Sequence, residues 1–96
     1  MVEIDVKNFA GNILFLRSLA NEERMKILAL IIKKPVPAQE IEKLFYMEQS
    51  TASYHLNMMR RAGILSCHKE GKRAIYSYNE GSLDNQYSDF LRNIKK

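Results

Sequence analysis

The chain has 96 residues, of which 46% are hydrophobic and 27% are charged, and its formal net charge at pH 7 is +4. We expect one folded domain, residues 1–96, because the length excludes a second core and the composition excludes a disordered segment. Charges interrupt every apolar run, no signal-peptide core is present and the single cysteine excludes an intrachain disulfide, so we expect a cytoplasmic protein without a membrane span.

The first part of the chain predicts three helices. The first, Val6 to Leu19, carries apolar residues at helical spacing, namely Phe9, Ile13, Leu16 and Ala20. The second follows Asn21, a favourable N-cap residue, and its apolar stripe consists of Ile27, Leu28, Ile31 and Ile32. Pro35 and Pro37 end that helix, and Pro37 suits the first turn of a third helix. The apolar face of this third helix holds Ile41, Leu44 and Phe45.

A fourth helix, residues 48–62, is predicted after a short turn, with Glu48 as its cap. If Ala52 points inward, a step of about 100° per residue places on the core side Leu56, Met59 and Gly63. The outward side holds Ser50, Tyr54, Asn57 and Arg61, flanked by Gln49, Thr51 and Ser53. A merely solvated face would more often carry pairs of Glu and Lys, so this face indicates binding.

Two strands are predicted next, Ile64 to Glu70 and Arg73 to Asn79, turned by Gly71 and Lys72. We expect one side of the second strand to face the core, with Ala74, Tyr76 and Tyr78, and the other side to hold Arg73, Ile75 and Ser77.

The positive charge is concentrated in one part of the chain. Between Ser53 and Arg73 lie five of the 15 cations and one of the 11 anions, a local charge of +4. The other residues hold ten cations and ten anions, so the whole net charge lies on this helix–hairpin unit. A helix fits the major groove of DNA, and a cationic hairpin can lie along phosphates or an adjacent minor groove, so the unit predicts a DNA-binding protein.

A last helix, about Leu83 to Lys95, follows Gly81 and has an apolar stripe. The order α-α-α-α-β-β-α, with five to six helices, indicates a winged helix-turn-helix, mainly α with a β-hairpin wing. A second subunit would bury the stripes of both terminal helices, although they could also pack within one protomer. We expect a homodimer whose interface is formed by Phe9, Ile13, Leu16, Tyr87, Phe90, Leu91 and Ile94.

Three segments between about Leu16 and Asn79 have recognisable patterns. They read L-A-N-E-E-R-M-K-I-L, E-Q-S-T-A-S-Y-H-L-N-M-M-R-R-A-G-I-L and E-G-K-R-A-I-Y-S-Y-N. Over this range the chain resembles the ArsR/SmtB-type winged-helix transcriptional repressors of bacteria and archaea. The first segment is similar to the opening pattern of that family, and the third resembles its wing. The second resembles its recognition-helix signature, with Glu48 for the usual serine and Met59 for the usual leucine.

The resemblance implies a homodimer that represses transcription by occupying a palindromic operator in double-stranded DNA. It implies DNA contacts from the recognition helix 48–62, through Gln49, Ser50, Thr51, Ser53, Tyr54 and His55. In the wing, residues 64–79, it implies contacts from Lys72 and Arg73. Asn57 and Arg61 join this set through their outward positions on the helix.

Many members of that family respond to metal ions, but the residues of their metal sites are absent here. The Cys-x-Cys pair of the family falls on Pro37 and Gln39, and the last helix offers only Asp84 and Asp89, without histidine. No catalytic constellation is present either. We therefore expect a protein that is not an enzyme, binds no metal or cofactor and is not metal-responsive.

Two alternatives stay open. In the first, oxidation of Cys67 in the first wing strand makes the protein a thiol-oxidation-sensing repressor. The simpler interpretation of Cys67 is that it is a small, half-buried hydrophobic residue. The other alternative is a winged-helix module that binds proteins and no longer binds DNA. A protein interface would prefer exposed apolar anchors, which the polar helix face does not offer.

Overall fold

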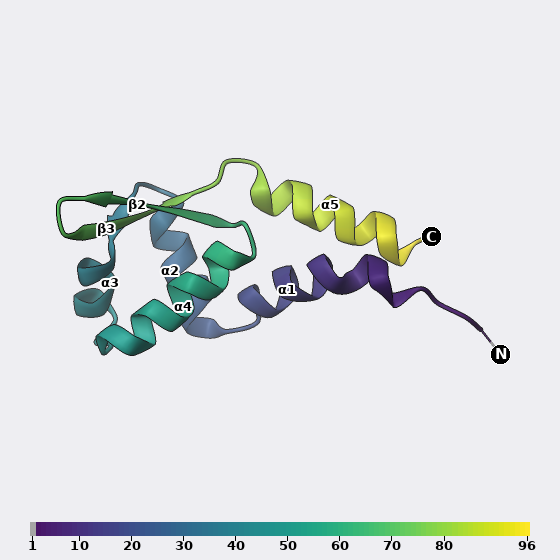
Figure 1. Ribbon diagram of the computed structural model, residues 1–96, viewed down its shortest axis with the longest axis horizontal. Coiled ribbons are helices and arrows are strands. Elements are labelled where there is room, and N and C mark those ends of the chain that lie inside the picture. Colours follow the sequence, from purple (N-terminus) through teal and green to yellow (C-terminus); the bar gives the residue numbers. More distant parts are fainter. Residues whose placement is uncertain (1) are drawn as a thin grey trace.

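The computed structural model describes residues 2–96. Figure 1 shows an elongated molecule, and its principal extents are 53 × 23 × 20 Å. Its elements in chain order are the 3-10 helix η1 (Val6–Phe9), α1 (Ala10–Leu19), α2 (Glu22–Ile31), β1 (Val36–Pro37), α3 (Ala38–Leu44), α4 (Gln49–Arg61), β2 (Leu65–Glu70), β3 (Arg73–Tyr78) and α5 (Ser82–Ile94). The predicted order of helices and strands is therefore present, with one short strand added.

The core lies where α2, α3, α4 and the sheet meet. Helical spacing on α2 and α4 brings apolar side chains onto one face of each helix, and the largest fully buried residues include Ile27, Ile31, Ile41, Leu56, Met59, Ile64 and Leu65. Burial of each such side chain contributes about 1.5–3 kcal/mol. The start of α2 is fixed by its N-cap, because the Asn21 side chain accepts a hydrogen bond of 3.0 Å from the backbone nitrogen of Arg24.

The sheet has three strands, in the order β1-β3-β2. β1 pairs antiparallel with β3, with Val36 opposite Tyr76 and Pro37 opposite Ile75. The sequence analysis expected this segment to end the second helix and to begin the third, and did not predict a strand. It also placed Ile75 on the side of β3 away from the core, yet Ile75 is only 6% exposed, because β1 and α3 both lie against β3.

One other prediction about a helix face needs correction. Leu44 was expected to be inward with Ile41, but it lies at the last residue of α3 and is 51% exposed. The residues that α1 buries are not its apolar stripe but Asn12, Phe15 and Ser18. Ile13 and Leu16 of that stripe are exposed in the protomer.

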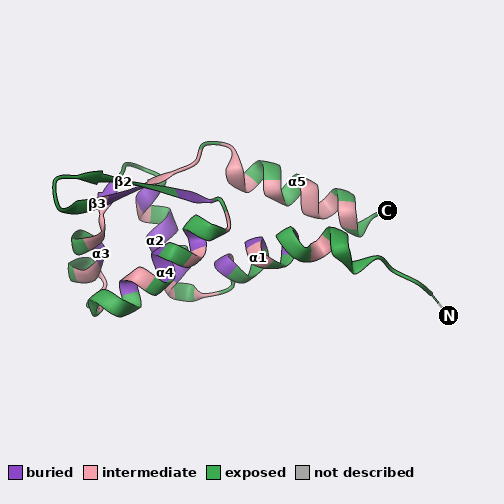
Figure 2. Cartoon of the chain, in the orientation of Figure 1, coloured by how far each residue is buried: buried purple, intermediate pink, exposed green. Residues whose placement is uncertain are grey.

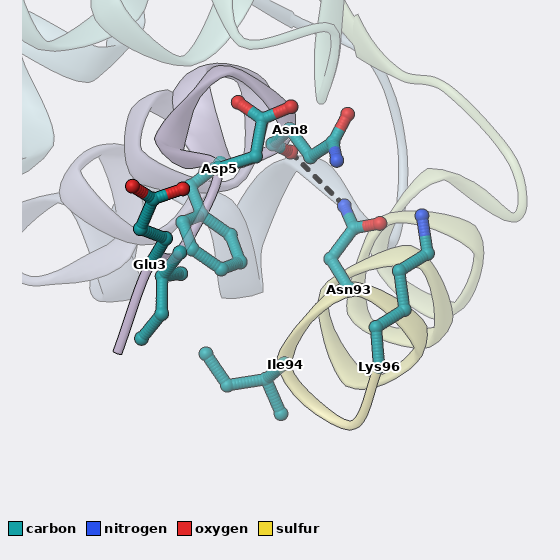
Figure 3. A pocket seen from close by; sticks show the side chains of 8 residues that line it. Glu3, Asp5, Asn8, Asn93, Ile94 and Lys96 are labelled. Carbon is teal, nitrogen blue, oxygen red and sulfur yellow. Dashed lines mark hydrogen bonds between the residues drawn. The ribbon is translucent and has the colours of Figure 1, made fainter. Parts of the chain in front are cut away.

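The helices η1, α1 and α5 extend together away from the core toward the two chain ends, as Figure 1 shows, and they contact one another. Polar side chains connect them. Asn12 Nδ2 donates to Asp89 Oδ2 at 3.1 Å, and Asn93 Nδ2 donates to Asn12 Oδ1 at 2.8 Å. Asn93 also donates to the backbone oxygen of Asn8 at 3.1 Å, which Figure 3 shows beside Ile94. Most of this end is exposed or half-buried (Figure 2).

Candidate nucleic-acid interface

The helix α4 separates its residues cleanly into two faces. Ala52, Leu56 and Met59 are at most 1% exposed and form part of the core. On the other side Tyr54 is 61% exposed, and the other exposed residues of α4 are Gln49, Ser50, Thr51, Asn57, Arg60 and Arg61. Ser53 is half-buried. The predicted outward face is therefore an accessible polar surface along α4. Gly63, expected on the core side, lies beyond the end of the helix and is exposed.

The wing presents its charges at the tip. Glu70 pairs with Arg73, so Gly71 and Lys72 form a two-residue loop, and Gly71 has a φ of +61°, as a type II′ turn requires at its first central position. Lys72 and Arg73 are exposed. Figure 1 shows the hairpin tip at the end of the long axis away from the chain termini, the end at which α4 also begins.

His55, expected among the DNA contacts, lies on the inner side of α4 and is 8% exposed. Its Nδ1 atom is 3.0 Å from Nη1 of Arg24, a residue of α2 that is only 5% exposed. Arg24 also donates from Nε to the backbone oxygen of Ser18 at 2.8 Å and from Nη2 to that of Arg17 at 3.2 Å. One buried guanidinium therefore connects the end of α1, the start of α2 and the middle of α4.

The chemistry of this contact fixes the state of the imidazole. A guanidinium has only donors and keeps its proton, so Nδ1 of His55 must accept, and the proton of the neutral ring is then on Nε2. Burial, followed by the positive charge of Arg24, lowers the pKa of His55 below its usual 6.5, while the negative charge of Glu23 acts in the other direction. Sequence analysis missed the role of Arg24, although this arginine is part of the L-A-N-E-E-R-M-K-I-L match.

Comparison with known proteins identifies the family. A profile described as a helix-turn-helix domain matches residues 19–68. The transcriptional activator HlyU of Vibrio cholerae is 31% identical over 71 residues, which cover 74% of this chain and 66% of that relative. The homodimeric winged helix-turn-helix domain of Mb0332 from Mycobacterium bovis, a possible ArsR-family regulator, has the same fold, with a TM-score of 0.74 at 22% identity over 95% of this chain and 88% of that one. This chain belongs to the ArsR-type winged helix-turn-helix regulators.

Other relatives agree with this assignment. The transcriptional repressor SdpR of Bacillus subtilis is 29% identical over 80 residues, which cover 83% of this chain and 89% of that protein. The relatives are named as regulators of transcription, so this ArsR-type chain is a transcriptional regulator and not an enzyme. The mainly helical winged helix-turn-helix predicted from the sequence is confirmed.

The residues at the family's metal positions do not form a ligand cluster in this ArsR-type chain. Within residues 2–96, no three side chains of His, Cys, Asp or Glu come together in a way that could hold a metal ion. Asp84 is exposed, whereas Asp89 accepts hydrogen bonds from Asn12 and Arg92, which lower the pKa of its carboxyl group. Over the same residues, no helix is long and apolar enough to cross a membrane.

Cys67 is a free, exposed thiol in this regulator, not the half-buried residue that the sequence analysis favoured. The reason is its strand: β2 lies at an edge of the sheet, and each of its residues after Leu65 is exposed. Cys67 lies opposite Tyr76 of β3. Burial, and then the neighbouring Cys67, raise the pKa of the Tyr76 hydroxyl.

Proposed function

We propose that this chain is a cytoplasmic, sequence-specific transcriptional repressor that binds a palindromic operator in double-stranded DNA as a homodimer. In this proposal residues 1–96 form a single DNA-binding domain, and metal ions do not control it. The observation that carries the proposal is the outward face of α4, where the exposed residues are polar or aromatic and none is Lys or Glu.

In the proposed complex α4 lies in the major groove. Ser50 and Asn57 offer short donors and acceptors that can read base edges, and Tyr54 and Arg61 extend the same face toward the C-terminal end of the helix. Gln49, Thr51 and Ser53 flank it near the N-terminal end, where helix amides also favour phosphates. His55 supports the face from within through Arg24 instead of taking part in base reading.

The wing contributes contacts that do not depend on sequence. Lys72 and Arg73 are exposed at the hairpin tip, and Lys69 adds a further cation on β2. Cations on a protruding hairpin suit the phosphate backbone, where each neutralised phosphate releases condensed counterions. The concentration of the chain's net charge on α4 and the wing supports this division of roles.

The homodimer is supported by apolar side chains that one protomer leaves uncovered. Ile13 is 51% exposed, Leu16 39%, Tyr87 55% and Ile94 54%, while Phe9, Phe90 and Leu91 are half-buried. All belong to η1, α1 or α5, the elements that extend beyond the core. Apolar patches of this kind in a small protein mark interaction surfaces. The solved relative Mb0332 is described as homodimeric.

Selection of DNA from a random duplex pool by the purified protein tests the proposal. We expect enrichment of an inverted repeat whose half-sites are about 34 Å apart, one turn of DNA. A protein that binds no duplex even at low salt would contradict the proposal and favour the protein-binding alternative. With the enriched duplex, micromolar zinc should leave the gel-shifted complex intact. Release of the DNA by zinc, reversed by a chelator, would contradict the proposal that metal ions do not control binding.

A further inference from the structure

A shallow groove of about 300 Å³ lies between α1 and α4. α1 lines it with Leu14 and Arg17, and α4 lines it with Tyr54, Asn57, Met58 and Arg61. Three of the α4 residues belong to the outward face already assigned to DNA. Arg17 does not, because it precedes the helix-turn-helix and lies far from the wing in the sequence. The groove therefore extends the polar face of α4 onto α1.

Arg17 is exposed and is the single charged residue among the ten of α1. Within residues 2–96, neither Arg17 nor Arg61 forms an ion pair, and neither side chain donates a hydrogen bond to the protein. No acidic residue lines the groove. Two arginines therefore line one opening, and their guanidinium donors are unused within the protein. The fork of donors on a guanidinium group matches the oxygens of a phosphate.

The position of Arg17 relative to α4 is fixed by the buried Arg24. The backbone oxygen of Arg17 accepts from Nη2 of Arg24, whose Nη1 bonds the imidazole of His55 on α4. One side chain thus holds the last turn of α1 against the recognition helix. Leu14 and Met58, both half-buried, supply the apolar part of the groove's lining.

We propose that this groove receives a phosphodiester of the DNA backbone beside the major groove that α4 enters, with Arg17 and Arg61 as donors. This inference rests on the proposed function, and it adds α1 to the DNA-binding elements. The backbone of bound DNA suits the groove better than a free anion does, because the groove is open and shallow. A small anion would keep its water there, whereas the other protein–DNA contacts hold a backbone phosphate in position.

The test compares the wild-type protein with Arg17→Gln and Arg17→Lys, using Lys26→Gln as the matched control. Lys26 lies on α2 in an ion pair with Glu22 and does not line the groove, so its replacement removes one charge elsewhere. Binding to a selected duplex and to a random duplex is measured from about 0.05 to 0.5 M salt, because each phosphate contact adds about 0.9 to the salt slope.

For Arg17→Gln we expect the slope to fall by about 0.9 per bound protomer and the affinity for both duplexes to fall equally, about fivefold per protomer near 0.15 M salt. Arg17→Lys should retain most of the slope, and Lys26→Gln all of it. Melting temperature is measured for each variant, because Arg17 also lies favourably at a helix C-terminus. An unchanged slope in a folded Arg17→Gln protein overturns the inference and leaves the proposed function intact.

Ethylation interference locates the contact. Wild-type binding should be blocked by ethylation of a phosphate that no longer matters in Arg17→Gln, while interference at the wing phosphates remains. A titration with inorganic phosphate against chloride at constant ionic strength, followed by NMR, tests whether the groove binds a free phosphate ion instead of the DNA backbone. Saturable shifts at Arg17 in free protein, absent in Arg17→Gln, would identify a small-anion site and overturn the inference. A wild-type protein without any DNA binding would instead contradict the proposed function.

Discussion

Nη1 of Arg24 lies 3.0 Å from Nδ1 of His55, so a buried guanidinium on α2 donates to a neutral imidazole on α4. Neither group has a carboxylate in ion-pair distance within residues 2–96. The positive charge is instead solvated by the ring nitrogen and by two backbone oxygens at the end of α1, where the helix dipole is negative. The recognition helix is therefore held by a contact that requires the imidazole to stay neutral.

Replacement of Arg24 should destabilise the protein strongly. Arg24→Met keeps much of the apolar stem but leaves the backbone oxygens of Arg17 and Ser18 without their donor. Loss of charged hydrogen bonds at a buried site costs about 3 kcal/mol. Urea unfolding should show this loss of free energy, whereas Lys26→Met, on the exposed side of the same helix, should change it by about 0.5 kcal/mol or less. Equal effects of the two substitutions would contradict the structural role of Arg24.

Stability should depend on pH through His55. Its pKa in the folded protein lies below the usual 6.5, so below that pH the unfolded chain binds more protons than the folded one. The contribution of the neutral ring is complete above pH 6.5 and is lost as the pH falls from 6.5 through the lowered pKa. Unfolding midpoints measured across this range should therefore decrease toward acid.

Two variants distinguish the histidines in that measurement. His55→Asn keeps an acceptor for Arg24 near the Nδ1 position but does not titrate, so it should flatten the decrease. His68→Asn, at the other histidine, which is exposed in the wing and paired with Glu70, should leave the decrease as in the wild type. A pH profile that follows His68 instead of His55 would show that the buried contact is not its source.

The α4 face and the wing should affect DNA binding differently. Ser50→Ala or Tyr54→Ala should reduce the discrimination between the selected sequence and random duplex by about 1–3 kcal/mol for each base edge that the helix no longer reads. Lys72→Ala or Arg73→Ala should weaken binding to all sequences by similar amounts and lower the salt slope. Competition binding measures both quantities. If wing variants altered sequence preference and α4 variants did not, the roles would be reversed.

The proposed dimer should dissociate when a charge is introduced on the exposed apolar surface of α1. Ile13 is 51% exposed in the protomer, so Ile13→Glu should leave the fold intact but place a carboxylate in the proposed interface. Sedimentation at micromolar concentration should show monomers with weak affinity for the inverted repeat. Leu44→Glu, equally exposed on α3, serves as control and should remain dimeric. A monomeric wild-type protein that still binds the repeat tightly would disprove this arrangement.

Oxidation of Cys67 should not control DNA binding. The thiol is exposed on β2, but within residues 2–96 the chain offers no second cysteine, so an intrachain disulfide cannot form. Mild peroxide or diamide should leave the affinity of wild type and Cys67→Ser equal. A loss of affinity in the wild type alone, restored by reductant, would instead support the thiol-sensing alternative through an intersubunit or mixed disulfide.

The outward face of α4 could be predicted because the apolar stripe of this helix, Ala52, Leu56 and Met59, packs into the core of the same protomer. The buried face of α1 could not, since it contains Asn12 and Ser18, which are buried with hydrogen bonds to Asp89 and to the backbone of Phe15. Helical spacing of apolar residues does not reveal buried polar residues whose hydrogen-bond partners lie elsewhere in the chain. The apolar residues that it did find on α1 are the exposed ones.

The buried position of Arg24 and the strand β1 could not be predicted, for related reasons. An arginine in the first turn of a helix is ordinarily exposed, and its partner His55 lies 31 residues further along the chain. A two-residue strand that contains a proline has no alternation to recognise, and it forms because β3 offers an edge. Both depend on tertiary contacts that no local pattern contains.

The pairing of β1 with β3 has a mechanical consequence. α3 starts at the residue after β1, and β3 continues from the wing tip to the strand position opposite Val36. The β1–β3 pairing thus joins the hairpin to the helix-turn-helix, and we expect the two to move together as one rigid body. In the proposed homodimer, a signal that frees the protein from DNA is then expected to change the separation of the two rigid bodies, by shifting α1 and α5 at the proposed interface, without rearranging either body.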